Sequence, residues 1–184
     1  MRKLAVFLAL VMILGLTACN AVQKAPDNTG VPDKGDKGDK IVEPSPQTEE
    51  KEITLYFANK NYIQTGDEKL EKVIAEKRII QYGNISLEEA VVRELMMGPK
   101  NNELSTGIPS GSKLLGVEVS DGTAFVNFAQ EGLHGGSLQE GLTISQIVKS
   151  LTELENVDRV QFLIDGKKAE TLMGHMSIFE SFEK

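Results

Sequence analysis

Two histidines and one cysteine are the side chains with the widest chemical repertoire in this 184-residue sequence. His134 lies in the glycine-rich stretch 132–137, GLHGGS. Such a loop can border the oxyanion site of an esterase, but these enzymes also need a nucleophilic serine in a G-x-S-x-G turn. Residues 107–111, GIPSG, place Ser110 one position too late. The sequence therefore predicts no catalytic residue. Residues 132–137 are interpreted as a surface loop leading to a helix, and ligand binding there is left open.

His175 stands near the C-terminus in residues 173–176, MGHM. A protein metal site needs three or four ligands, and no second ligand stands at a useful spacing from this histidine. We therefore expect His175 to pack against a sheet edge, with no metal bound. The sequence also contains no phosphate loop, dinucleotide fingerprint or zinc pattern, so no cofactor is expected.

Acidic residues are plentiful, but catalysis by a carboxylate pair depends on a spatial separation that sequence does not give. Most charged side chains are interpreted as solvated. This prediction covers acids on the outer faces of helices and two charged runs: Glu88, Glu89, Glu94, Glu153, Glu155, Glu76-Lys77-Arg78 and Lys167-Lys168.

The single cysteine excludes an internal disulfide and a cysteine-based metal cluster, since both need partners. Its position favours another chemistry. A basic start, Met1-Arg2-Lys3, is followed by an uncharged apolar run over residues 4–16 and by small residues before Cys19. This order is typical of a secretory signal peptide, and the run is shorter than the roughly 20 residues that span a bilayer.

Leu16-Thr17-Ala18-Cys19 resembles the bacterial lipobox. The resemblance implies that residues 1–18 are removed and that Cys19 is diacylated on sulfur. Two acyl chains anchor a protein stably to a membrane where one chain would not. We therefore expect a lipid-anchored protein on the extracytoplasmic face of the cell membrane. The alternative is an ordinary signal peptide followed by an incidental cysteine.

The net charge limits the partners. Loss of Arg2 and Lys3 with the signal peptide changes the formal charge from −7 to −9. Binding to nucleic acid or to an anionic membrane surface needs clustered basic residues, so neither is expected. Residues 19–52 are rich in Pro, Gly, Asp and Lys, a composition typical of a disordered linker. A flexible chain of this length spans about 30 Å.

Residues typical of regular secondary structure begin at Ile53, so residues 53–184 are predicted to form the folded domain. Residues 53–58, ITLYFA, favour a strand, whereas residues 70–82 suit either a helix or a strand. Ser86 and Glu89 form a capping-box pattern at the start of a helix that Gly98-Pro99 should end.

Residues 114–128 predict a β-hairpin, because Asp121-Gly122 favours a two-residue type I′ turn. Residues 143–154 predict a second helix, capped at Asn156, and residues 157–164 predict a strand that turns back at Asp165-Gly166. The order favours an α+β (mixed α/β) fold, with a small mixed sheet and two helices packed on one face. The turn fixes the expected hairpin pairs: Ser120 with Thr123, Val119 with Ala124, Val117 with Val126, and Leu115 with Phe128.

These segments together resemble the GerMN domain family of sporulation and spore germination proteins. The resemblance covers nearly the whole chain after residue 52. It implies a fold similar to ring-building modules and an extracytoplasmic protein, often a lipoprotein of Gram-positive bacteria. The protein that names the family carries two such domains, whereas this chain has room for one. The matching segments are Leu55-Tyr56-Phe57, residues 94–99 (ELMMGP), residues 108–124, residues 146–152 and residues 157–167.

The sequence as a whole predicts a non-enzymatic interaction module, lipid-anchored at Cys19, that binds envelope proteins of unknown identity in the cell or spore envelope. A role in sporulation or germination follows only from the resemblance. The alternatives are a module that binds peptidoglycan or a small ligand, and an accessory to a cell-wall hydrolase.

Overall fold

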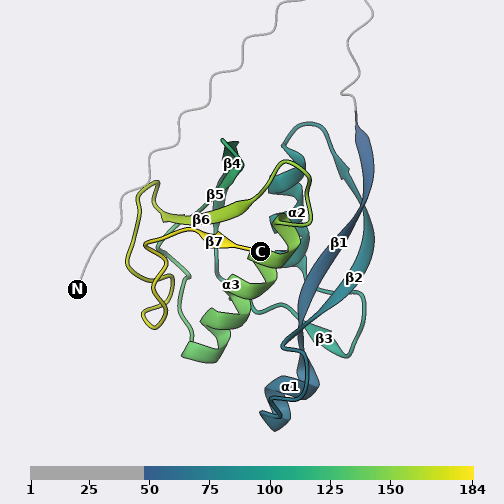
Figure 1. Cartoon of the computed structure of the whole chain (residues 1–184), viewed down its shortest axis with the longest axis vertical. Helices are drawn as coiled ribbons and strands as arrows, with labels where there is room; N and C mark the ends of the chain where they lie inside the picture. Colours follow the sequence, from purple (N-terminus) through teal and green to yellow (C-terminus); the bar gives the residue numbers. More distant parts are fainter. Residues whose placement is uncertain (1–47) are drawn as a thin grey trace, which may run out of the picture. The chain divides into compact units, whose positions relative to one another are not determined.

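The computed structural model describes residues 48–184, which form two β-sheets and three helices (Figure 1). The α+β class is confirmed, but the strands form two sheets where one small sheet was expected. Along the chain the elements are β1 (Glu49–Asn59), α1 (Lys60–Thr65), β2 (Val73–Tyr82), α2 (Leu87–Met97), β3 (Leu104–Ser105), β4 (Leu114–Ser120), β5 (Thr123–Phe128), α3 (Ser137–Leu151), β6 (Arg159–Ile164) and β7 (Phe182–Glu183).

The two longer helices lie between the sheets. One sheet has the order β2-β1-β3, and the other has the order β4-β5-β6-β7, with β5 and β6 parallel. Both α2 and α3 contact strands of each sheet, and Figure 1 shows them between the β1–β2 ribbon and the β4–β7 sheet. Apolar side chains from all these layers form one main core, whose buried members run from Ile53 to Ile178. A chain that begins at residue 20 therefore contains the complete core.

The ambiguous segment at residues 70–82 forms β2, which pairs antiparallel with β1 over ten residues. Side chains alternate along β1, so Ile53, Leu55 and Phe57 share the face that is buried in the core. The first strand also begins at Glu49, four residues before the expected start. Its early part consists of exposed charged residues, which carry no apolar signal in the sequence.

The helix α2 begins as predicted. Ser86 caps it, and its hydroxyl accepts a hydrogen bond from the backbone N–H of Glu89 at 3.1 Å. The second half of the capping box is not formed, because the Glu89 carboxylate accepts a hydrogen bond from Nε of Arg93, at 2.8 Å. The helix ends at Met97, with the Gly98 N–H donating to the carbonyls of Glu94 and Leu95.

The β4–β5 hairpin has the predicted turn. Asp121 and Gly122 both have positive φ, 50° and 71°, as a type I′ turn requires. The pairs nearest the turn are those expected, but Leu114 pairs with Phe128 in place of Leu115. A register shift between Leu114 and Gly116 causes this difference. Leu115 is consequently 54% exposed and does not join the core, which corrects the prediction.

Two residues of β4 allow a test of which side chains of the hairpin belong to the core. Val117 is 6% exposed and faces the core, whereas Leu115, two residues earlier on the same strand, is exposed by the bulge. Val117→Asp should lower the free energy of unfolding by about 3 kcal/mol, because it buries a charge without a partner. Leu115→Asp should change it by less than about 0.5 kcal/mol. Urea unfolding measures both, and equal losses in the two variants would contradict the register.

The helix α3 begins six residues before the predicted start and ends at Leu151, with Thr152 as its C-cap. Asn156 is not the cap, because its side chain donates to the Glu88 carboxylate at 2.7 Å. The buried polar residues of α3 bind the backbone of neighbouring segments. Gln146 accepts from the N–H of Gly107 at 2.8 Å, and the Ser150 hydroxyl accepts from the N–H of Tyr56 at 2.9 Å.

Two of the charged groups that were predicted to be solvated are buried. Glu88 is 8% exposed and Arg78 is 6% exposed. The Arg78 guanidinium lies between the carboxylates of Glu76 and Glu94, which compensate its buried charge, whereas Lys77 of the same run is exposed as expected. Glu153 and Glu155 are exposed, as expected, but they follow the end of α3.

The predicted signal peptide, Cys19 and nearly all of the predicted linker lie outside the described residues. Among residues 48–184, no helix combines the length and the apolar character that crossing a membrane requires.

Candidate functional site

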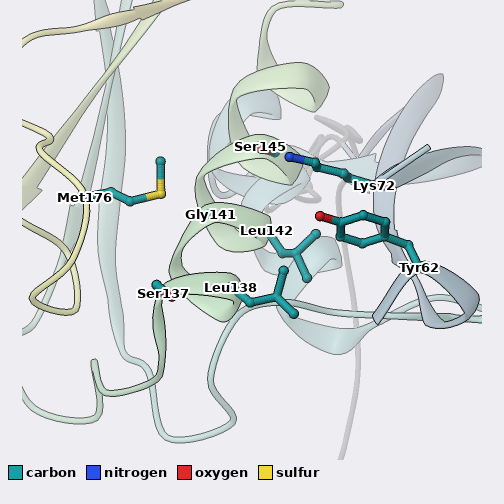
Figure 2. Close-up of a pocket in the computed structure, with 8 residues that line it drawn as sticks. All are labelled: Tyr62, Lys72, Ser137, Leu138, Gly141, Leu142, Ser145 and Met176. Carbon is teal, nitrogen blue, oxygen red and sulfur yellow. The ribbon is translucent and has the colours of Figure 1, made fainter. Parts of the chain in front are cut away.

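A groove crosses the N-terminal half of α3 and has a cavity volume of about 380 Å³ (Figure 2). Its floor is one face of the helix, because residues three, four and seven positions apart share a face. The floor residues are Leu138, Gly141, Leu142 and Ser145.

The walls of the groove come from distant parts of the chain. Tyr62 of α1 and Lys72, which precedes β2, approach the helix from one side, and Met176 approaches from the other (Figure 2). Ser137, the first residue of α3, lies at one end. Ser145 lies at the other end of the floor, near Lys72 (Figure 2).

Asn59 positions the Tyr62–Lys72 wall. It is 8% exposed, and its side chain accepts from the N–H of Asn61 and donates to the carbonyl of Glu71, both at 3.0 Å. Its own N–H donates to the carbonyl of Lys72 at 3.0 Å. Asn59 therefore caps α1 and also joins it to the start of β2.

A small apolar cluster fixes the floor against the same wall. Leu142 packs with Ala58 of β1 and Val73 of β2, and all three side chains are at least 96% buried. The face of α3 is therefore held next to the β1–β2 ribbon. Burial of apolar side chains in this way is the main stabilising contribution in a folded domain.

Glu140 positions the opposite wall. Its side chain is fully buried, and its carboxylate accepts four backbone hydrogen bonds from the segment that carries Met176. Oε1 accepts from the N–H groups of Leu172 at 2.9 Å and Met173 at 2.7 Å. Oε2 accepts from the N–H groups of His175 at 2.8 Å and Met176 at 3.1 Å. Several such bonds satisfy the buried charge and fix this loop to α3.

The groove carries one cationic side chain. The ammonium of Lys72 lies 5.7 Å from the centre of the Tyr62 ring, a cation–π contact. Within residues 48–184, no carboxylate lies within 4.0 Å of this ammonium. The other groove residues are apolar or hydroxylic. The groove is thus apolar along its floor and positive on one side.

A second groove, of about 480 Å³, lies between α2 and β2. Its apolar lining includes Met96 and Met97, and Met97 is 72% exposed. Arg93, Glu94 and Gln81 supply polar groups around it. Met96 is partly buried against the core, so Met97 supplies the exposed part of this surface, and a methionine side chain is flexible enough to adapt to different partners.

The charged groups under this second groove are coupled. Arg78 donates to Glu94 at 2.6 Å and also pairs with Glu76. Burial by itself would raise the pKa of Glu76, but hydrogen bonds from Arg78 and from the N–H groups of Asn101 and Lys100 outweigh it and lower that pKa. Burial would also lower the pKa of Arg78, and its two carboxylate partners raise it instead. The cluster therefore stays ionised and holds α2 to β2.

The structure does not bring Ser110, His134 and His175, the residues weighed in the sequence as catalytic or metal-binding candidates, together into one site. The glycine-rich loop does contact residues 107–113, at Gly111 and Gly132. Both Ser110 and His134 are exposed, and His134 forms no hydrogen bond with a serine hydroxyl in the described part of the chain. His175 is exposed, and its Nε2 lies 3.1 Å from the carbonyl of Gly135, so its expected place at a sheet edge was wrong. Across residues 48–184, no group of three or more potential ligands is arranged to hold a metal ion.

Sequence reasoning missed the residues of the α3 groove. Its nearest indication was the loop 132–137, whose last residue, Ser137, lies at the end of the groove. The helix α1 has a local signal, since Asn59 and Gly66 stand at its two ends as caps. The walls meet the floor only through tertiary contacts, which the sequence does not reveal.

Comparison with known proteins identifies the fold. A family model named Germane, described as "Sporulation and spore germination", matches residues 54–170. The first GerMN domain of the sporulation protein GerM from Bacillus subtilis aligns with a TM-score of 0.58, at 19% identity, over 72% of this chain and 97% of that chain. The tandem GerMN domains of the same protein align with a TM-score of 0.57, at 21% identity, over 80% of this chain and 49% of that chain.

A provisionally assigned lipoprotein from Clostridium perfringens aligns with a TM-score of 0.48, at 21% identity, over 73% of this chain and 88% of that chain. No match was found among curated proteins.

Proposed function

The chain belongs to the Germane (GerMN) family of sporulation and spore germination domains, and from this premise we propose that it is a lipid-anchored envelope protein that acts by binding another protein. The anchor is the diacylated Cys19, and the domain works on the extracytoplasmic face without catalysing a reaction. Its role belongs to sporulation or germination, in keeping with the family.

The observation that carries this proposal is the α2–β2 groove. Met97 exposes most of its side chain beside a hollow of about 480 Å³. Two charged residues also line the hollow: Arg93, which pairs with Glu89, and Glu94, which pairs with Arg78. Protein interfaces commonly combine an apolar centre, enriched in methionine and arginine, with a polar rim. A membrane anchor raises the local concentration of such a surface near its partner, so a modest affinity suffices.

The proposal predicts a site-specific crosslink. A photoreactive amino acid at Arg93, which is exposed at the groove, should capture an envelope protein in intact sporulating cells. Met97→Glu in the same chain should reduce that capture by about tenfold or more, because truncating or charging an interface anchor costs about 1–3 kcal/mol. The melting temperature should not change, because Met97 is 72% exposed. Mass spectrometry identifies the captured protein.

The control places the photoreactive residue at Glu155, an exposed position away from this groove, where no equivalent capture is expected. Capture of no protein from Arg93 in growth or in sporulation, together with cosedimentation of the purified domain with cell-wall sacculi, would favour the peptidoglycan-binding alternative. Turnover of muropeptides by the purified domain would instead indicate an enzyme.

A further inference from the structure

We propose that the groove over α3 is a binding site for a small amphiphilic carboxylate, a molecule with an apolar chain and one anionic head. This site lies on a different helix from the proposed protein-binding surface and does not depend on it.

The size and the lining suit a small ligand. Ligand sites are commonly hollows of about 300–1,000 Å³ that are mostly apolar with a few polar groups, and this groove measures about 380 Å³. Leu138 and Met176 keep 46% and 39% of their surfaces exposed on the floor and on one wall. An apolar chain that covers these side chains removes their surface from water, which favours binding.

The position of Lys72 selects the charge of the ligand. Its ammonium rests on the Tyr62 ring and has no carboxylate within 4.0 Å in the described residues. Lys72 and Ser145 both line the groove, and in the view of Figure 2 the ammonium is directed toward α3. A carboxylate there can accept hydrogen bonds from the ammonium and from the hydroxyl, with its chain extending toward Leu138 and Met176.

The groove is held in shape without a ligand. Asn59 fixes the wall that carries Tyr62 and Lys72, and Glu140 fixes the wall that carries Met176 through bonds of 2.7–3.1 Å. A preformed site loses less conformational entropy on binding than a flexible one. This arrangement therefore favours binding even by a molecule with few atoms.

Gly141 lets the wall that carries Met176 lie close to the floor. A Cβ at this position would lie 3.2 Å from the sulfur of Met176, so a larger side chain there would displace Met176 or fill the adjoining part of the groove. Glycine in the middle of a helix is unfavourable by about 1 kcal/mol relative to alanine. A glycine at position 141 therefore makes α3 less stable, which fits a need for space between the helix and Met176.

The test uses the chain from Asn20 to Lys184, labelled with ¹⁵N and titrated with octanoate while amide spectra are recorded. Octanoate should bind with a dissociation constant of about 1 mM, as expected for a ligand of about ten heavy atoms. The shifts should centre on Leu138, Gly141 and Ser145. Octylammonium, which has the same chain and the opposite charge, should bind at least about tenfold more weakly because it is repelled by Lys72.

Two variants and two matched controls locate the site. Lys72→Glu should weaken octanoate binding at least about tenfold and make octylammonium the better ligand, since the charge of the wall is reversed. Lys69→Glu, which makes the same change in net charge three residues away, should leave both affinities within about twofold. Gly141→Leu should abolish binding of both ligands by filling the floor. Gly141→Ala should weaken binding less and keep the fold, because alanine favours the helix.

Selective binding of octanoate with these variant effects supports the site. Three results would each overturn it: equal affinity for octanoate and octylammonium, shifts centred away from α3, or octanoate binding that Gly141→Leu leaves unchanged. The unfolding midpoint of each variant, measured in parallel, ensures that a loss of binding is not a loss of the fold.

Discussion

Replacing Glu140 with alanine should lower the free energy of unfolding by about 4 kcal/mol or more, a larger effect than that of any other single side-chain truncation in α3. The carboxylate accepts hydrogen bonds from four backbone N–H groups, and the side chain is completely buried. Each buried N–H left without a partner costs about 1–3 kcal/mol. The loop that includes Leu172 to Met176 should therefore detach from the helix first.

The design separates the charge from the size of the side chain. Glu140→Gln keeps the volume but offers one carbonyl oxygen in place of two acceptor oxygens, so about half of the loss is expected. Glu155→Ala, at an exposed position, should change stability by less than about 0.5 kcal/mol. Urea unfolding gives the energies, and amide hydrogen exchange follows Leu172, Met173 and Met176. Unchanged exchange at these amides in Glu140→Ala would show that the carboxylate does not hold the loop.

Local signals in the sequence were enough to predict most of the elements. Ser86 and Gly98 bracket α2, and Asp121-Gly122 produces the expected type I′ turn, because caps and tight turns depend on residues next to each other. The register near the turn followed from the same rule. The predicted register was wrong at Leu115, where the strand has a register shift. A β-bulge depends on how the strand packs, and the residue types on either side of Leu115 do not indicate one.

Other errors arose where buried polar side chains interrupt an apolar pattern. The helix α3 was expected to begin at Thr143, since its first turns contain Glu140, which reads as a solvent-facing acid. The structure buries this residue because a loop more than thirty positions later supplies its four donors. Arg78 was misjudged for a similar reason, because Glu94, one of its two carboxylate partners, lies on α2 and not on the strand that carries Arg78.

The candidate groove was beyond the reach of sequence analysis for a related reason. Tyr62, Leu138 and Met176 come from three separate elements, and none belongs to a motif. What brings them together is Asn59 on one side and Glu140 on the other, both acting through backbone groups. Hydrogen bonds to backbone atoms impose no matching residue type on the partner segment. The sequence therefore contains no pair of side chains from which the contact could be inferred.

Replacing Cys19 with alanine should abolish acylation, an expected loss of at least about tenfold in incorporated lipid, and any chain whose leader is cleaved at another site should leave the membrane fraction. The cysteine supplies the sulfur that carries two acyl chains in the lipoprotein hypothesis, and stable anchoring needs both. Residues 48–184 contain no helix able to replace the anchor. The variant should either keep its apolar leader uncleaved or be shed into the medium. Incorporation of radiolabelled palmitate and cell fractionation measure the two effects.

A rescue experiment distinguishes the anchor from a specific role of the lipid. Fusing residues 20–184 to an unrelated transmembrane helix should restore both the membrane location and the crosslink from Arg93, because tethering alone sets the effective concentration, which reaches about the millimolar range for short flexible linkers. The soluble Cys19→Ala chain should give the crosslink only when it is greatly overproduced. If Cys19→Ala still incorporates lipid and fractionates with the membrane as the wild type does, the lipoprotein hypothesis fails. If the fused chain returns to the membrane without recovering the crosslink, the partner recognises the acylated N-terminus itself, and the groove between α2 and β2 is not sufficient for binding.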